Sequence, residues 1–226
     1  MTLKERAVTA LNYGIPDAIP TFELEFQLVP ELKNGRDFTS SWALDQMHLS
    51  EKERDRKLFE NAELMVEVYS ALEYSIFNVA YLNFEDVKKT VRYIKELSGE
   101  KFLLTHHGDG TFALPDGNGM YDFAYRMADD PEGLHEEAER MANAAIAYNK
   151  RLFDCGIESF MLCSDYCYNS GPFLSPAMFR EFITPYLAKI IYEIRKMGGY
   201  AIKHTDGNIM PILDQLIECE PHCIHS

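Results

Sequence analysis

Acidic and imidazole side chains follow two short apolar runs of this sequence. His204 and Asp206 come directly after residues 200–203, and Asp165 follows residues 157–163, where a carboxylate facing a substrate is expected. A histidine and a carboxylate two positions apart can share a face, bind a divalent metal or act as an acid and base pair. The alternative is a structural turn with a hydrogen-bonded histidine, in which the glycine at 207 permits a tight bend.

Two further pairs of residues have the types and spacing of a functional site. Glu23 and Glu25 lie in an apolar run at residues 19–26, and a spacing of two places both on one face of a strand. In a sheet interior, one carboxylate would need a cation, a hydrogen-bond donor or a raised pKa. The alternative is that both point outward. His106 and His107 directly follow the run at residues 101–105. Strand alternation would turn one of them inward, as a functional residue, and the other towards solvent.

Alternating helical and strand patterns must position these residues. Amphipathic stretches alternate with short apolar runs, which is typical of an α/β fold with a parallel sheet. Capping residues, proline and glycine mark many of the boundaries. The predicted strands are residues 19–26, 74–81, 101–105, 157–163, 200–203 and a sixth opening at 222, and the predicted helices are residues 2–12, 50–72, 83–97, 130–155, 175–197 and 209–219.

Six strand-and-helix units are compatible with two architectures. One is an open doubly wound sheet, and the other is a (β/α)₈ TIM barrel, which has roughly 250 residues. A chain that stops inside a strand favours an incomplete barrel, although a short edge strand is the alternative. We therefore predict one barrel domain over residues 1–226, truncated after the start of the sixth strand, with ligands at the carboxyl ends of its strands.

Composition excludes several classes of protein. The 226 residues are 46% apolar and carry a formal net charge of -14, which indicates a globular chain without the basic face that nucleic acids or anionic membranes need. No uninterrupted apolar segment reaches the roughly 18 residues of a membrane span, and residues 1–6 lack the apolar core of a signal peptide. Five cysteines favour a reducing cytoplasm. The Cys163/Cys167 and Cys219/Cys223 spacings could indicate structural zinc, but buried free cysteines are the favoured interpretation.

One stretch of the sequence resembles a known family. The run from Gly171 to Tyr186, with Leu174-Ser175-Pro176 and Phe179-Arg180-Glu181-Phe182, is similar to a run of the uroporphyrinogen decarboxylase superfamily. The segment from His204 to Asn208 and the beginning of the chain, with Ile19-Pro20, also resemble that superfamily. The resemblance implies a (β/α)₈ barrel whose last two units are missing here. It also implies one of two activities, decarboxylation of porphyrin precursors or zinc-dependent methyl transfer involving corrinoid proteins or thiols.

Departures from the superfamily's patterns favour methyl transfer. The decarboxylases carry an arginine-rich loop after their first strand, whereas here Lys33 and Arg36 are distant and the strand offers Glu23 and Glu25. Their catalytic aspartate is also missing from residues 74–83. Negative charges at the mouth of a barrel would repel a polyanionic substrate. In the thiol-methylating branch a cysteine stands where this chain has Asp206, and an oxygen and nitrogen site suits a metal acting as a Lewis acid.

The resemblance therefore implies a zinc-dependent methyltransferase that moves a methyl group from a small donor to a corrinoid protein. Zinc is expected on His204 and Asp206, with a possible glutamate from residues 19–26, and a homodimer is a family expectation. The remaining expected roles are catalytic for Asp165, Glu25 and His106, and substrate-binding for Glu23, Tyr166 and Asn208. Two alternatives stay open: a uroporphyrinogen decarboxylase of porphyrin biosynthesis, and a non-catalytic fragment or binding module, whose uncovered strand edges would recruit a partner.

Overall fold

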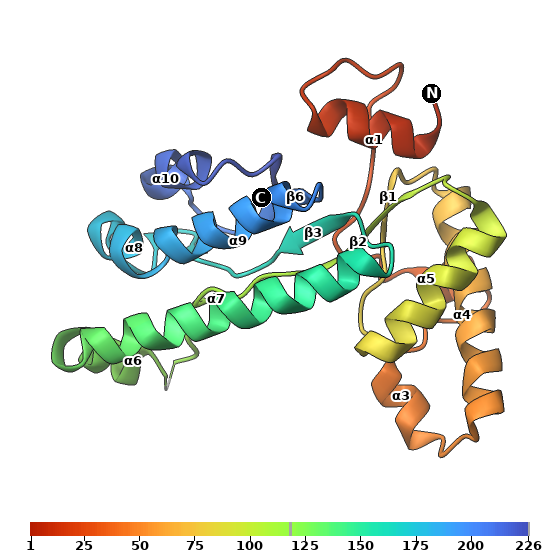
Figure 1. The fold of residues 1–226 in the computed structure, drawn as a ribbon, viewed down its shortest axis with the longest axis horizontal. Coiled ribbons are helices and arrows are strands. Elements are labelled where there is room, and N and C mark those ends of the chain that lie inside the picture. Colours follow the sequence, from red (N-terminus) through yellow and green to blue (C-terminus); the bar gives the residue numbers. More distant parts are fainter. Residues whose placement is uncertain (118, 226) are drawn as a thin grey trace. The chain divides into compact units, whose positions relative to one another are not determined.

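A computed structural model describes residues 1–117 and 119–225 of the chain. Two compact units make up the fold (Figure 1). The first unit comprises Met1–His106 and Asp154–Ser159, and the second comprises His107–Phe153 and Phe160–Ser226. Within the described residues, no helix combines the length and the apolar character needed to cross a membrane.

Capped helices and two parallel strands form the first unit. The side chains of Thr2, Ser50 and Asn83 accept hydrogen bonds from the first turns of α1 (Leu3–Leu11), α4 (Glu51–Ala71) and α5 (Phe84–Ser98). Capping was predicted for Ser50 and Asn83. The apolar faces of α4 and α5 pack side by side (Figure 1), and β1 pairs in parallel with β2. The elements are α1 (Leu3–Leu11), α2 (Val29–Leu32), α3 (Ser41–Gln46), α4 (Glu51–Ala71), β1 (Ile76–Asn78), α5 (Phe84–Ser98) and β2 (Leu103–His107).

The predicted strand at residues 19–26 is wrong, because these residues form no strand. The Ser75 amide donates a hydrogen bond to the Thr21 carbonyl, so the segment does run near β1. Pro20 cannot donate to a strand ladder, and Ile19 is exposed rather than buried in a core. Glu23 and Glu25 therefore lie on an irregular segment, where strand alternation does not fix their directions.

Helices and short strands alternate in the second unit. The helix α7 (Pro131–Asp154) begins after Asp130, as the aspartate-proline pair predicts. Strands β3 (Ser159–Leu162) and β6 (Tyr200–His204) are neighbours, and β6 pairs in parallel with β7 (Cys223–His225), so that His204 is level with His225. The other elements are α6 (Gly119–Asp129), β3 (Ser159–Leu162), β4 (Cys167–Tyr168), β5 (Gly171–Pro172), α8 (Pro176–Phe182), α9 (Thr184–Lys196), β6 (Tyr200–His204), η1 (Met210–Ile212), α10 (Leu213–Glu218) and β7 (Cys223–His225).

Two details of the second unit differ from the sequence-based expectation. The helix predicted over residues 175–197 is divided at Ile183 into α8 and α9. Pro185 explains the break, because it lacks the amide hydrogen that would bond to the Glu181 carbonyl in a continuous helix, and its ring would clash with that carbonyl. The loop predicted from Asp165 to Leu174 contains the short antiparallel hairpin β4–β5.

Candidate metal centre

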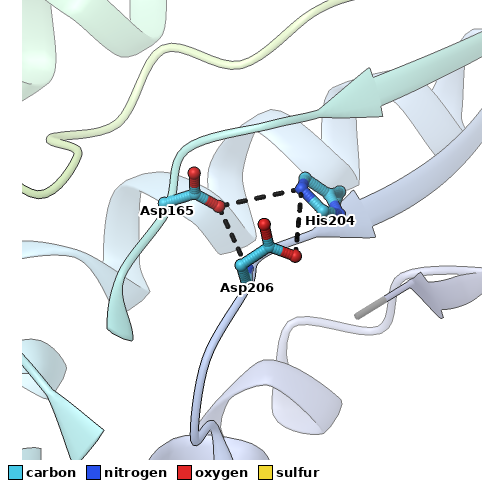
Figure 2. Close-up of side chains that lie close together, drawn as sticks. All are labelled: Asp165, His204 and Asp206. Carbon is cyan, nitrogen blue, oxygen red and sulfur yellow. Dashed lines mark hydrogen bonds and ion pairs between the residues drawn. The ribbon is translucent and has the colours of Figure 1, made fainter. Parts of the chain in front are cut away.

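Three side chains of the second unit converge at the ends of β3 and β6, as Figure 2 shows. Asp165 lies on the loop after β3, His204 ends β6, and Asp206 follows it. The Nε2 atom of His204 lies 3.7 Å from a carboxylate oxygen of Asp165 and 3.7 Å from one of Asp206. We call these three residues the histidine cluster. It is the group of histidine, cysteine and acidic side chains that, within the described residues, has metal-ligating geometry, with one ligand atom from each residue within 4.8 Å of the others.

Exposure differs sharply within the histidine cluster. The His204 side chain is 9% exposed, whereas Asp165 is 48% and Asp206 is 72% exposed. The Asp206 amide donates a 3.0 Å hydrogen bond to Asp165 Oδ1, which holds the two segments together. The imidazole is thus fixed from within the fold, while both carboxylates face solvent and can turn towards a ligand.

His225 fixes the orientation of the central imidazole. Its Nδ1 atom lies 2.9 Å from Nδ1 of His204 on the adjacent strand, so one ring donates a hydrogen bond to the other. Burial, followed by the neighbouring His204, lowers the pKa of His225, which favours a neutral ring. When His204 donates from Nδ1, its Nε2 atom carries a lone pair that points to the two carboxylates. This Nδ1-protonated tautomer is the one that can bind a metal through Nε2.

A close backbone approach shapes the turn after Asp206. Gly207 has φ +87°, and a Cβ atom there would lie 2.7 Å from the carbonyl oxygens of Cys167 and Tyr168. Only glycine fits this conformation and this contact. The Asn208 amide donates to the Tyr168 carbonyl, and its side-chain oxygen accepts from the Met210 amide. The side-chain oxygen of Asn208, expected to bind substrate, therefore has a structural role in this turn.

A buried lysine lies next to the histidine cluster. The Lys203 side chain is 0% exposed, and its Nζ donates to Asp109 Oδ2 at 3.0 Å and to the Leu162 and Ser164 carbonyls at 2.9 Å each. It also lies 4.1 Å from the centre of the Tyr166 ring. All three ammonium hydrogens therefore have acceptors. We call Asp109, Thr111, Ser164, Tyr166 and Lys203 the lysine cluster.

The Asp109 carboxylate completes the lysine cluster. One oxygen accepts from the Gly110 amide and from the amide and hydroxyl of Thr111, and the other accepts from the Ser164 amide and Lys203. Burial alone would raise the Asp109 pKa, but the Lys203 charge and these donors lower it. For Lys203, burial lowers the pKa more than Asp109 raises it. The pair is stable because each charge is hydrogen-bonded on every side.

The lysine cluster holds the peptide that carries Asp165. The Ser164 amide binds Asp109 and its carbonyl binds Lys203, while the Asp165 carbonyl accepts from the Leu114 amide at 2.8 Å. Tyr166 is fully buried, with its amide on Thr205 and its hydroxyl 2.6 Å from Thr111. The ring of Tyr166, which was expected to bind substrate, thus has no exposed surface in this structure, and that role stays a prediction.

The donor set of the histidine cluster fits zinc. Imidazole nitrogen and carboxylate oxygen bind zinc at about 2.0–2.2 Å, which places ligand atoms roughly 3 to 4 Å apart around one ion. Both distances from His204 Nε2 lie in this range. Rotation of the exposed Asp206 carboxylate can bring its oxygen closer to the Asp165 oxygen, so that all three ligand atoms surround one ion. Asp165, expected to be catalytic, takes the geometry of a third ligand.

The remaining expected site residues, Glu23, Glu25 and His106, lie in the first unit. Glu23 accepts a 3.1 Å hydrogen bond from the Tyr74 hydroxyl, and Glu25 lines a cavity at the end of β1. His106 is buried near the end of β2, and His107 is only partly buried. The cysteines are free thiols, and no group of three or more histidine, cysteine and acidic residues with metal-ligating geometry includes one within the described part of the chain.

Sequence reasoning missed Lys203, Asp109 and His225. A lysine inside the apolar run at residues 200–203 is a signal that could have indicated a buried ion pair, since lysine is rarely fully buried without a partner. Asp109 lies between two glycines in a loop, where no strand or helix pattern indicates that it is buried. His225 required the parallel register of β6 and β7, which the sequence does not encode as a motif.

Comparisons with known proteins agree on the family. The family model described as uroporphyrinogen decarboxylase (URO-D) matches residues 85–226, which is more than half of the chain. Uroporphyrinogen decarboxylases from Xanthomonas axonopodis pv. citri (strain 306) and Xanthomonas campestris pv. campestris (strain B100) are 30% and 29% identical over 132 residues. Each match covers 52% of this chain and 36% of the relative, so the similarity spans about a third of the curated relatives' length.

A solved structure shares the fold. The methyltransferase from Methanosarcina mazei matches 99% of this chain and 75% of its own, with a TM-score of 0.71 and 14% identity. At that identity the likeness shows the fold alone, and it confirms the predicted α/β fold class. Together with the match over residues 85–226, these findings show that the chain belongs to the uroporphyrinogen decarboxylase (URO-D) family.

Proposed function

We propose that this chain is a zinc-dependent methyltransferase that moves a methyl group from a small donor to a corrinoid protein. The observation that carries the proposal is the convergence of His204 Nε2 with the carboxylates of Asp165 and Asp206, both 3.7 Å away. This donor set contains nitrogen and oxygen and no thiolate. The fold shared with a methyltransferase is consistent with this activity.

Each residue of the centre has a defined part in the proposal. His204 would offer its Nε2 lone pair, with its Nδ1 hydrogen directed to His225, and Asp165 and Asp206 would each offer one oxygen. Bound zinc supplies Lewis acidity towards an oxygen of the methyl donor, which makes that oxygen a better leaving group. The lysine cluster keeps the Ser164–Asp165 peptide in place while the exposed side of the centre stays open to the donor.

Methylation of free cobalamin tests the proposal. Zinc-loaded protein, reduced cobalamin and a panel of methyl ethers and methanol should give the absorption change of methylcobalamin, and His204→Ala should abolish it. Glu181→Gln, an exposed change on α8, is the matched control and should keep the activity. Equal rates for wild type and His204→Ala would contradict the proposal.

A second candidate activity is uroporphyrinogen decarboxylation. The observation that favours it is the name shared by the curated relatives at 29–30% identity. This activity predicts turnover of uroporphyrinogen by metal-depleted protein, with unchanged rates in His204→Ala. Direct analysis of the carboxylated and decarboxylated porphyrins separates the two candidates.

A further inference from the structure

A cavity of 140 Å³ lies within the first unit, at the carboxyl end of β1. Its volume corresponds to about five water molecules. Four segments form its walls: residues 24–27, residues 38–40, the α4 positions Met65 and Tyr69, and the residues that end and follow β1. The carboxyl end of a parallel strand is where α/β folds bind ligands.

Aromatic rings dominate the apolar part of this wall. Phe38 stacks on Tyr69, with ring centres 6.0 Å apart, and Tyr69 stacks on Phe77, with centres 4.2 Å apart. Phe26 packs edge-on against Tyr74. The aromatic lining residues are Phe26, Phe38, Tyr69 and Tyr81. Ring faces attract cations through their negative quadrupole, and clusters of such rings recognise methylated ammonium groups.

The charge of the cavity is negative and unbalanced. Glu25 lines it, and no lysine, arginine or histidine is among the lining residues. Over residues 1–117 and 119–225, Glu25 forms no ion pair, in contrast to Glu67 of the same unit, which pairs with Lys33. A partly buried carboxylate beside aromatic rings is costly unless a cation accompanies it.

The Asn78 amide joins the wall at residues 24–27 to the end of β1. Asn78 is 5% exposed, and its Nδ2 donates a 2.6 Å hydrogen bond to the Leu24 carbonyl. Because that carbonyl needs a donor, the orientation of the amide is fixed. Its Oδ1 is buried and, within the described residues, has no hydrogen-bond partner. Because this oxygen has no accessible surface, it does not contact a ligand in the cavity, and the role of the amide is to hold the Leu24 segment.

Hydrogen bonds hold the walls of the cavity in place. Asn61 accepts from the Thr39 amide and donates to the Thr39 carbonyl, and the Ser40 side chain caps α3. The Asn78–Leu24 bond fixes the wall at residues 24–27. A site with fixed walls needs little ordering on binding, which favours affinity for a small ligand.

We propose that this cavity binds a small organic cation of the methylated ammonium class, held by Glu25 and the aromatic rings. Its charge complements the carboxylate, its methyl groups match the ring faces, and its size matches the space. The inference concerns binding and stands on the first unit alone, so it does not depend on the metal centre.

Calorimetric titration with choline tests the inference, and 3,3-dimethylbutan-1-ol, its neutral isostere, tests the role of charge. Choline should bind at least tenfold more tightly than the isostere, in chelator-treated and zinc-loaded protein alike. Glu25→Gln should weaken choline binding about tenfold. Glu23→Gln is the matched control, because Glu23 contacts Tyr74 and does not line the cavity, and it should change binding less than twofold.

A ring variant provides a second, independent readout. Phe26→Leu keeps an apolar side chain but removes a ring, and it should weaken choline severalfold while leaving isostere binding unchanged. Circular dichroism verifies that each variant is folded. Absence of choline binding, equal affinity for the isostere, or equal losses in Glu23→Gln and Glu25→Gln would overturn the inference. Choline binding by zinc-free His204→Ala protein would support the inference even if the metal centre were refuted.

Discussion

The lysine cluster and the histidine cluster are adjacent in the chain but opposite in character. Lys203 is fully buried and the Asp109 side chain is only 11% exposed, and their charged groups are hydrogen-bonded within the fold. The carboxylates of Asp165 and Asp206, by contrast, face solvent around one buried imidazole. A satisfied buried network stabilises and orients its surroundings, whereas incompletely coordinated groups at a strand end can accept a ligand. The comparison separates residues that hold the site from residues that do its chemistry.

Loss of the buried lysine is expected to have the largest effect. Lys203→Met leaves the Asp109 carboxylate buried without its cation and should lower the free energy of unfolding by about 3–5 kcal/mol. Denaturant unfolding measures this loss. The double variant Asp109→Asn/Lys203→Met should recover part of it, and Lys196→Met, at an exposed position, should cost less than about 0.5 kcal/mol. Equal stabilities of the two lysine variants would remove the distinction between the clusters.

Loss of the supporting imidazole is expected to have an intermediate effect. His225→Phe removes the hydrogen-bond partner of His204 and should weaken zinc binding roughly 10–100-fold, as is usual for groups that orient a metal ligand. His225→Gln retains an acceptor and should restore part of the affinity. Competition with a zinc chelator gives both constants, and unchanged affinity in His225→Phe would show that the imidazole pair does not orient the ligand.

Acid should affect the lysine cluster through Asp109. Its folded pKa is lowered, so its ionisation stabilises the fold above the unfolded pKa of about 3.9, and this contribution is lost as pH falls through the lower folded value. Each unit of difference is worth about 1.4 kcal/mol. Unfolding measured between pH 5 and 3 should show a shallower dependence in Asp109→Asn/Lys203→Met than in wild type. Identical slopes would mean that Asp109 titrates alike in both states.

The smallest effect on stability is expected in the histidine cluster. Asp206→Asn changes an exposed carboxylate and should alter the unfolding free energy of metal-free protein by less than about 0.5 kcal/mol. Thermal melts of zinc-free samples provide the measurement. A loss comparable to that of Lys203→Met would assign Asp206 to the structural network.

Local patterns predicted much of the fold, and long-range pairing explains what they missed. Ser50, Asn83 and the Asp130-Pro131 pair predict their helices because capping involves neighbouring residues. The run at residues 19–26 has the composition of a strand, but a strand forms only when its backbone pairs with a partner. Pro20 has no amide hydrogen to donate to such a partner, and the run forms no strand. In the same way, His204 and Asp206 were accessible as a motif, whereas the His225 contact depends on the register of β6 and β7.

Zinc binding tests the central claim most directly. Equilibrium dialysis followed by metal analysis should give about one zinc per chain for wild type, and His204→Ala and Asp206→Ala should lose most of it. Their metal-free forms should remain folded by circular dichroism. Zinc contents of both variants equal to that of wild type would contradict the assignment of Asp165, His204 and Asp206 as a metal centre.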